Sequence, residues 1–209
     1  MIRLYDYILS SDCYKVRLLL GMLQVEFETV KVNFHPRAEH RQPDFLALNP
    51  LGSLPVLTDG DLVLRGALPI VSYLAQTHDP ARRWYPADAA AAARVLMWLD
   101  FAERELAPIS EARFLNLIGR DDDLSPLVAA GEAALEILED HLAEGEIAGR
   151  QWVAADHATI ADLVLFPASA MAPEGGIGLE TKPAIWRWLD RVKRLPNFIV
   201  MPGVLPLLG

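Results

Sequence analysis

The chain has 209 residues, of which 52% are hydrophobic and 22% charged, a composition that suits a compact globular protein and excludes an intrinsically disordered one. Its formal net charge is −9 and neither half gathers Lys and Arg into a basic cluster, which excludes nucleic acid and an anionic membrane surface as expected partners. The longest apolar runs, such as residues 18–23, are too short to cross a bilayer.

The cellular setting is indicated by the cysteine count and by the first residues. The single cysteine, Cys13, cannot form an internal disulfide, as expected in a reducing compartment. Arg3 and Asp6 interrupt the apolar stretch that a signal peptide would need. We therefore expect a soluble, cytoplasmic protein. The histidines show no spacing suited to a metal site, so no metal is expected.

Residues 1–79 predict an alternation of strands and helices. Residues 2–9 are apolar and aromatic with partial alternation, which indicates a strand. Side chains that can cap a helix follow, and apolar residues then recur at helical spacing over residues 13–23. A second strand is expected over residues 27–32, and residues 43–48 leave room for one short helix.

This first region ends with a hairpin and a further helix. Two short apolar strands within residues 55–64 flank Asp59-Gly60, a dipeptide typical of tight hairpin turns. Apolar residues at helical spacing over residues 68–77 predict a helix. Residues 80–88 are mostly polar and form the expected linker.

Beyond the linker, residues 89–209 predict an all-helical domain. Helical patterns follow one another over residues 89–117, 125–142, 159–166 and 180–194. Pro108 is expected to kink the first of these helices. Ser125-Pro126 predicts an N-cap and a proline at the first helical position, and residues 159–162 form a capping box.

Three motifs in order give the chain a resemblance to a known family. They are Ser-Ser-Asp-Cys-Tyr-Lys-Val-Arg at residues 10–17, Phe-Leu-Ala-Leu-Asn-Pro-Leu-Gly-Ser-Leu-Pro-Val-Leu at residues 45–57, and Thr-Ile-Ala-Asp at residues 159–162. In this order and spacing they make nearly the whole chain resemble the glutathione transferase family. The resemblance implies an α/β thioredoxin-like N-terminal domain, an all-α C-terminal domain and a homodimer.

The resemblance also implies a sulfur-stabilising group at the start of the first helix. By motif position, Ser10 corresponds to the serine of the zeta- and theta-like bacterial members, whose hydroxyl hydrogen-bonds the sulfur of glutathione. A free thiol titrates at about pH 8.5, and a helix N-terminus with a hydroxyl donor lowers that pKa. Ser11 and Cys13 are the competing candidates. The alternative is that Ser10, Ser11 and Asp12 only cap the helix.

Two further segments are implied to bind the thiol. In the family the peptide before the proline of the second motif is cis, so Pro55 is expected to be cis and Leu54 to pair with the backbone of the ligand. The alternative is a trans proline that merely begins a strand. His40 and Arg41 lie where relatives carry basic residues that meet the glycine carboxylate of glutathione. The alternative for these two residues is an exposed polar segment.

The chain departs from the family where the helix after the hairpin begins. Relatives have Glu-Ser or Asp-Ser there, and these side chains hold the γ-glutamyl ammonium and carboxylate. This chain has Gly66-Ala67, which keeps the helix N–H groups but loses both side-chain contacts. A deficit of about 2–4 kcal/mol would weaken glutathione binding about 30- to 1,000-fold. A thiol other than glutathione, such as cysteine or a persulfide, is therefore a second hypothesis.

In the family the electrophile lies between the first domain and the first long helix of the second. The candidates for this pocket are Trp98, Phe101, Arg104, Glu105 and Arg113. The alternative is that the aromatic side chains at this spacing belong to the core. The apolar tail at residues 204–208 is expected either to cover the pocket or to pack against the helices.

These observations lead to two hypotheses of different classes. The first is an enzyme that activates a small thiol, either glutathione or another, and adds it to an electrophile or uses it in an isomerisation. The second is a non-catalytic descendant of the family that serves as a binding or interaction protein. The retained Ser10 and Pro55 favour the enzyme, whereas Gly66-Ala67 favours the binding protein.

Overall fold

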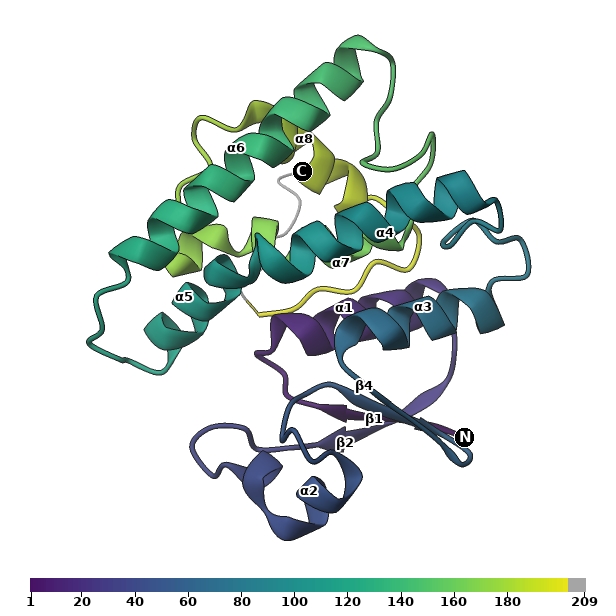
Figure 1. Cartoon of the computed structure of the whole chain (residues 1–209), viewed down its shortest axis with the longest axis vertical. Helices are drawn as coiled ribbons and strands as arrows, with labels where there is room; N and C mark the ends of the chain where they lie inside the picture. Colours follow the sequence, from purple (N-terminus) through teal and green to yellow (C-terminus); the bar gives the residue numbers. More distant parts are fainter. Residues whose placement is uncertain (203–209) are drawn as a thin grey trace.

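The computed structural model describes residues 1–202, so the tail at residues 204–208, expected to cover or flank the pocket, lies outside the described residues. Figure 1 shows an α/β lobe formed by the first part of the chain and an all-helical lobe formed by the rest. The predicted fold class, a thioredoxin-like domain followed by a helical domain, is confirmed.

The α/β lobe is centred on a four-stranded mixed sheet. Its strands are β1 (Ile2–Asp6), β2 (Phe27–Lys31), β3 (Val56–Asp59) and β4 (Leu62–Arg65), in the spatial order β2-β1-β3-β4. β1 is parallel to β2 and antiparallel to β3, which forms the predicted hairpin with β4. β1 ends at Asp6 rather than at residue 9, because the N–H of Ser10 donates to the carbonyl of Tyr7 at 2.9 Å and turns the chain.

Helices cover both faces of this sheet. They are α1 (Ser11–Met22), α2 (Pro43–Leu48) and α3 (Ala67–His78), with a 3-10 turn, η1 (Glu39–Arg41), before α2. α1 begins two residues before the predicted start, because Ser10 is its N-cap and accepts the N–H of Cys13 at 3.2 Å. α1 and α3 lie on the face toward the helical lobe, and α2 lies on the opposite face (Figure 1).

The helical lobe begins at α4, eleven residues after the end of α3 at His78. Its elements are α4 (Ala89–Arg104), α5 (Ala107–Leu117), α6 (Ser125–Ile147), α7 (Ile160–Ala170), η2 (Ala172–Gly175) and α8 (Pro183–Lys193). The single kinked helix predicted over residues 89–117 is wrong. The chain breaks after Arg104, and Pro108 lies in the first turn of α5, where its missing N–H needs no partner.

Two other helix starts differ from the prediction. Ser125 is the first residue of α6 rather than its cap, and its N–H donates to Oδ1 of Asp123 at 3.0 Å. α8 begins at Pro183 rather than at residue 180, because Glu139 of α6 accepts the first free N–H groups of the helix, both at 2.8 Å. Among residues 1–202, no helix has the length and apolar character needed to cross a membrane.

α7 forms the centre of the helical lobe, and the capping box predicted at its start is confirmed. Asp162 accepts the N–H of Thr159 at 2.9 Å, the N–H of Val153 at 3.1 Å and the indole N–H of Trp188 at 3.0 Å. Burial raises the pKa of Asp162, and the hydrogen bonds that it accepts act in the opposite direction. This carboxyl group therefore joins α7, the preceding loop and α8.

Candidate active site

A cavity of about 340 Å³ lies between the α/β lobe and α5. It is lined by Tyr7, Leu9, Ser10, Ser11, Asp12, Phe34, Arg41, Leu51, Gly52, Ser53, Leu54, Ser110, Arg113 and Phe114. These residues come from the turn after β1, the first turn of α1, the segment between β2 and α2, the loop before β3 and one face of α5. The volume is within the range of small-molecule sites.

The cavity collects only part of the predicted site. Among the predicted residues, Ser10, Ser11, Arg41, Leu54 and Arg113 line it. The other predicted residues do not, and these are Cys13, His40, Pro55, Gly66, Ala67, Trp98, Phe101, Arg104 and Glu105. Within residues 1–202, no three His, Cys, Asp or Glu side chains are grouped to hold a metal ion.

Ser10 and Ser11 present their hydroxyl groups where α1 begins. The oxygen of Ser10 accepts the N–H of Cys13 at 3.2 Å, and its rotatable hydroxyl hydrogen can point either to the cavity or to the sulfur of Cys13. The hydroxyl of Ser11 makes no hydrogen bond to another described residue. Because the first N–H groups of a helix have no intrahelical partner, this end of α1 also favours negative charge. Both serines therefore remain candidates for stabilising a thiolate.

Cys13 lies behind these serines with no exposed surface. Its sulfur accepts the N–H of Tyr7 at 3.5 Å. Burial, helped by the nearby carboxylate of Asp6, raises the pKa of Cys13 to about 12, although the hydrogen bond with Ser10 acts in the opposite direction. The side chain is thus a neutral, inaccessible thiol at physiological pH.

The loop before β3 is organised by the buried Asn49. Its amide Nδ2 donates to the carbonyl of Ser53 at 2.8 Å, and its Oδ1 accepts the N–H of Leu51 at 3.2 Å. The Leu54–Pro55 peptide is cis, as expected. Leu54 faces the cavity, and neither its N–H nor its C=O is hydrogen-bonded to another described residue. The loop therefore offers one free backbone donor and one free acceptor to a ligand.

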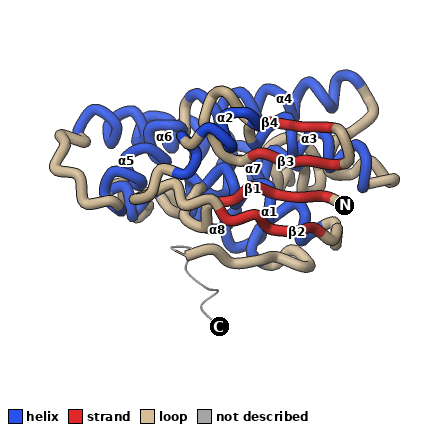
Figure 2. Tube along the Cα trace, turned by 90° about the horizontal axis from the view of Figure 1, so that it is seen from below, coloured by secondary structure: helices blue, strands red, loops and turns tan. Residues whose placement is uncertain are grey.

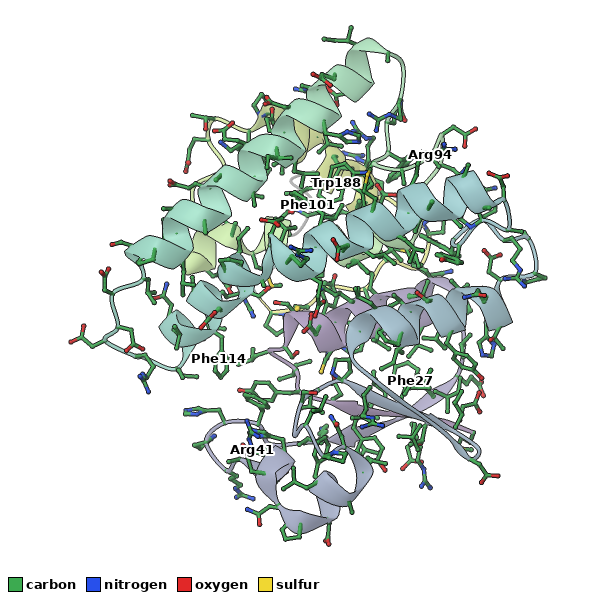
Figure 3. The ribbon with its side chains drawn as sticks, in the orientation of Figure 1. Phe27, Arg41, Arg94, Phe101, Phe114 and Trp188 are labelled. Atoms are coloured by element: carbon green, nitrogen blue, oxygen red, sulfur yellow. The ribbon has the colours of Figure 1, made fainter. Side chains whose placement is uncertain are left out.

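His40 and Arg41 are neighbours in η1 but occupy different environments. Arg41 is exposed and lines the cavity, and Figure 3 shows it on the α/β lobe, across from Phe114 of α5. The ring of His40 is buried and stacks on Phe34 with centroids 3.8 Å apart. Burial lowers the pKa of His40, and the charge of Arg41 acts in the same direction. A neutral His40 therefore supports the wall that Phe34 forms.

Most of the residues predicted for the electrophile pocket lie on α4, away from the cavity. Trp98 is 6% exposed, and its ring lies 5.2 Å from Phe101 and 4.4 Å from His141, in the core between α4 and α6. Arg104 is exposed and pairs with Asp100 at 3.7 Å. The chain breaks after α4, and the next helix, α5, forms the cavity wall instead. The residues of α4 therefore lie away from the cavity.

Three cavity residues on α5 follow a simple pattern. Ser110, Arg113 and Phe114 are spaced by three and four residues, so they share one face of the helix. Sequence reasoning singled out only Arg113 among them. The pattern could have identified the other two once a helix was taken to begin near Pro108. Phe34 and Tyr7, whose rings lie 5.8 Å apart, carry no comparable sequence signal.

Gly66 and Ala67 begin α3 beside the loop before β3. Gly66 has φ +82° and ψ 150°, and its N–H donates to the carbonyl of Pro55 at 3.0 Å. Ala67 is the first helical residue and is buried. The carboxylate and hydroxyl that the family resemblance leads us to expect at these two positions are therefore missing from the start of this helix.

The mixed sheet flanked by helices, the cis-proline loop and the all-helical second lobe define a thioredoxin-like fold joined to a helical domain. Residues 1–76 match the model of the glutathione S-transferase N-terminal domain, and residues 127–196 match that of the glutathione S-transferase C-terminal domain. The chain belongs to the glutathione S-transferase family. It is an enzyme of the transferase or isomerase type.

Relatives of two named activities support this assignment. Glutathione S-transferase 3 of Zea mays is 29% identical over 99% of this chain and 95% of its own length. Maleylacetoacetate isomerase of Pseudomonas aeruginosa is 30% identical over 94% of this chain and 93% of its own length. A crystal structure of a glutathione S-transferase from Xanthobacter autotrophicus Py2 has a TM-score of 0.86 and 33% identity, covering 97% of this chain and 98% of that one.

Proposed function

We propose that this enzyme binds a small thiol in the cavity and activates its sulfur with the hydroxyl of Ser10. The observation that supports this most directly is the hydrogen-bonding state of that hydroxyl. Its oxygen accepts the N–H of Cys13 and the residue borders the cavity, so its rotatable hydrogen can turn from the sulfur of Cys13 to a sulfur in the cavity. The positive end of the α1 dipole stabilises a thiolate at the same place.

The remaining thiol contacts are assigned to Leu54 and Arg41. The free N–H and C=O of Leu54 are suited to pair with the backbone of a thiol peptide. Arg41 is suited to a carboxylate of the thiol, because its exposed guanidinium lines the cavity. His40 acts indirectly in this proposal, by holding the ring of Phe34.

The electrophile is proposed to bind against an aromatic wall shared by the two lobes. Phe34 lies 5.8 Å from Tyr7 and 5.7 Å from Phe114 of α5, and all three rings border the cavity. An apolar, planar acceptor matches this surface. In this proposal, residues 1–79 form the thiol-binding domain and residues 80–88 form the linker. Residues 89–209 form the domain that completes the acceptor site.

Glutathione is the first thiol to test, because relatives over nearly the full chain are named glutathione transferases. The start of α3 favours a second candidate. Gly66 and Ala67 offer no side-chain partner to a γ-glutamyl ammonium group. A thiol without a γ-glutamyl group, such as cysteine or a persulfide, would not need that partner.

The chemistry follows from a stabilised thiolate. The S–H proton passes to water, the hydroxyl of Ser10 donates to the sulfur anion, and a sulfur lone pair attacks an electrophilic carbon. In a substitution, the new S–C bond forms as the leaving group departs with its bonding electrons. In an isomerisation, sulfur adds to a conjugated double bond, the resulting single bond rotates, and expulsion of sulfur restores the double bond.

The test is turnover of glutathione, cysteine and a persulfide with 1-chloro-2,4-dinitrobenzene, and of a cis double-bond substrate with each thiol. Ser10→Ala should lower kcat about 10- to 1,000-fold with the fold intact, because one hydrogen-bond donor to a developing anion contributes on this scale. Ser125→Ala is the matched control, since Ser125 is an exposed serine at the start of α6.

The other outcomes are equally informative. A fully active Ser10→Ala variant combined with an inactive Ser11→Ala variant would move the role to Ser11. Thiol binding without turnover in either assay would instead favour the non-catalytic binding protein.

A further inference from the structure

Arg113 is the most extensively bonded side chain of the cavity wall. Its Nε donates to Oε2 of Glu174 at 2.6 Å, Nη1 to the carbonyl of Leu9 at 2.7 Å, and Nη2 to the carbonyl of Pro202 at 3.4 Å. Only 3% of the side chain is exposed. The guanidinium charge is met by the Glu174 carboxylate, so Arg113 has little surface and little uncompensated charge to offer an electrophile.

The bond to Leu9 acts directly on the peptide that carries Ser10. The carbonyl of the Leu9–Ser10 peptide accepts from Arg113, and the N–H of the same peptide donates to the carbonyl of Tyr7 at 2.9 Å. Because a peptide unit is planar, hydrogen bonds on its two opposite edges fix its orientation. The next atom along the chain is Cα of Ser10, so the direction of the Ser10 hydroxyl depends on this plane.

The other end of Arg113 is firmly held by the helical lobe. Glu174 lies in η2, and its carbonyl accepts from Nδ2 of Asn116 on α5 at 3.0 Å. η2 and α5 approach closely at Gly175, where an added Cβ would lie 3.2 Å from the backbone nitrogen of Arg113. Arg113 and its carboxylate partner are thus fixed on one rigid pair of elements.

We propose that Arg113 is a positioning residue, through which the helical lobe sets the orientation of the Leu9–Ser10 peptide and aims the Ser10 hydroxyl at the sulfur. The inference rests on the proposed role of Ser10. It replaces electrophile binding as the role of Arg113. The helical lobe then contributes to thiol activation as well as to the acceptor site.

A double-mutant cycle between Arg113 and Ser10 tests this inference. Arg113→Ala should lower kcat about 10- to 100-fold, raise the pKa of the bound thiol toward its value in Ser10→Ala, and leave KM for the electrophile within about threefold. The thiolate absorbance of the enzyme–thiol complex, titrated against pH, reports that pKa. The Arg113→Ala/Ser10→Ala double variant should be no slower than Ser10→Ala alone, since the arginine acts through the serine.

Two controls separate positioning from general damage to the fold. Arg120→Ala removes an exposed arginine that pairs with Asp122 and should leave the thiol pKa and kcat unchanged. Free guanidinium ion should restore part of the kcat of Arg113→Ala but not that of Ser10→Ala. If Arg113→Ala does not fold, Arg113→Lys serves in its place, because one ammonium can keep either the Leu9 or the Glu174 contact, and it should show a smaller shift of the thiol pKa.

The outcomes distinguish the inference from the function on which it rests. Additive effects in the cycle, or a raised KM for the electrophile with an unchanged thiol pKa, would overturn the positioning role alone. Wild-type activity in Ser10→Ala would overturn the proposed function of Ser10 and the inference together.

Discussion

At the first turn of α1, Ser10 borders the cavity while Cys13, three residues later, has no exposed surface. The thiolate is the reactive form of cysteine, and burial raises the pKa of Cys13 to about 12. The sequence alone left Cys13 as a competitor of the two serines. Its environment in the folded chain argues for a structural side chain.

Native Cys13 should therefore react with a disulfide reagent at pH 8 far more slowly than the same residue in unfolded protein, by at least about 100-fold. The release of coloured thiol from Ellman's reagent, followed with and without denaturant, measures both rates. Fast labelling of the native protein would contradict the burial of this thiol, and Cys13 would again be a candidate for the group that contacts the sulfur of the ligand.

The same shift in pKa gives stability a pH dependence of known sign. Because the folded pKa lies above the unfolded one, the stabilisation is fully present below pH 9 and is lost as the pH rises toward 12. The free energy of unfolding should therefore fall more steeply with rising pH in the wild type than in Cys13→Ala between pH 9 and 12. Other groups that titrate there are common to both proteins and cancel in the comparison.

Residue identities were easier to predict from the sequence than residue contacts. Ser10 and Leu54 were found because local motifs mark them, and both line the cavity. The burial of His40 depends on Phe34 folding back over it, which no periodicity indicates. The partners of Arg113 at Leu9 and Pro202 are 104 and 89 residues away in the chain, so its role could not be derived from neighbouring residues.

At the scale of elements, the start of α3 departs from the motif that the family resemblance leads us to expect there. Gly66 has φ +82° and ψ 150°, a region of backbone conformation that is nearly restricted to glycine. An added Cβ would have room, since its nearest neighbour is Cδ of Pro69 at 3.8 Å. A side chain at this position is therefore opposed by backbone strain of about 1–3 kcal/mol rather than by a clash.

Wild-type protein should bind glutathione weakly, at about millimolar Kd or above, because the γ-glutamyl end lacks two side-chain partners. Gly66→Glu with Ala67→Ser should tighten binding at least about tenfold, since it restores a charge-assisted and a neutral hydrogen bond. The same double change should lower the free energy of unfolding by about 1–3 kcal/mol through strain at residue 66. Titration calorimetry and denaturant unfolding measure the two effects separately.

Gly66→Ala with Ala67→Ser is the matched control, because it introduces the strain without the carboxylate. It should match the loss of stability of the double change and show a smaller gain in affinity. Micromolar binding by the wild type would mean that another group serves the ammonium of glutathione. Weak binding by every variant would point to a site shaped for a different thiol.

Element boundaries show where sequence patterns stop being informative. The strands and the capping box at Thr159 were predicted because local pairing and capping determine them. The start of α8 was not, because Glu139 of α6, at least 45 residues away in the chain, supplies its cap. The break after Arg104 was also missed, since an alanine-rich segment with one proline is compatible with a kinked helix.

At the scale of the whole molecule, the cavity exists only where the two lobes meet. Four of the five residues predicted for the acceptor pocket lie on α4 or directly after it, whereas α5 lines the cavity with Ser110, Arg113 and Phe114, of which only Arg113 was predicted. Which helix lines the cavity is decided by the break between α4 and α5. The local motifs of the α/β lobe therefore contribute more of the predicted residues to the cavity than the helical lobe does.

β4 and α4 each carry exposed apolar side chains. Val63 of β4 is 39% exposed and Met97 of α4 is 58% exposed, with Leu62 and Leu96 beside them. Figure 2 shows β4 and α4 on the same side, opposite β2 and the last described residues. Exposed apolar side chains occur at protein–protein interfaces, and the family resemblance implies a homodimer.

We therefore expect light scattering to give a mass of about 46 kDa at micromolar concentration, twice the 23.1 kDa of one chain. Val63→Glu with Met97→Glu should shift the mass to that of one chain, because a symmetric interface would bury four new carboxylates. Ile147→Glu is the matched control: Ile147 is 90% exposed, but it ends α6 far from the α/β lobe (Figure 1). This control should remain dimeric. A wild-type mass near 23 kDa would contradict the dimer, and a dimer that persists in the double variant would place the interface on another surface.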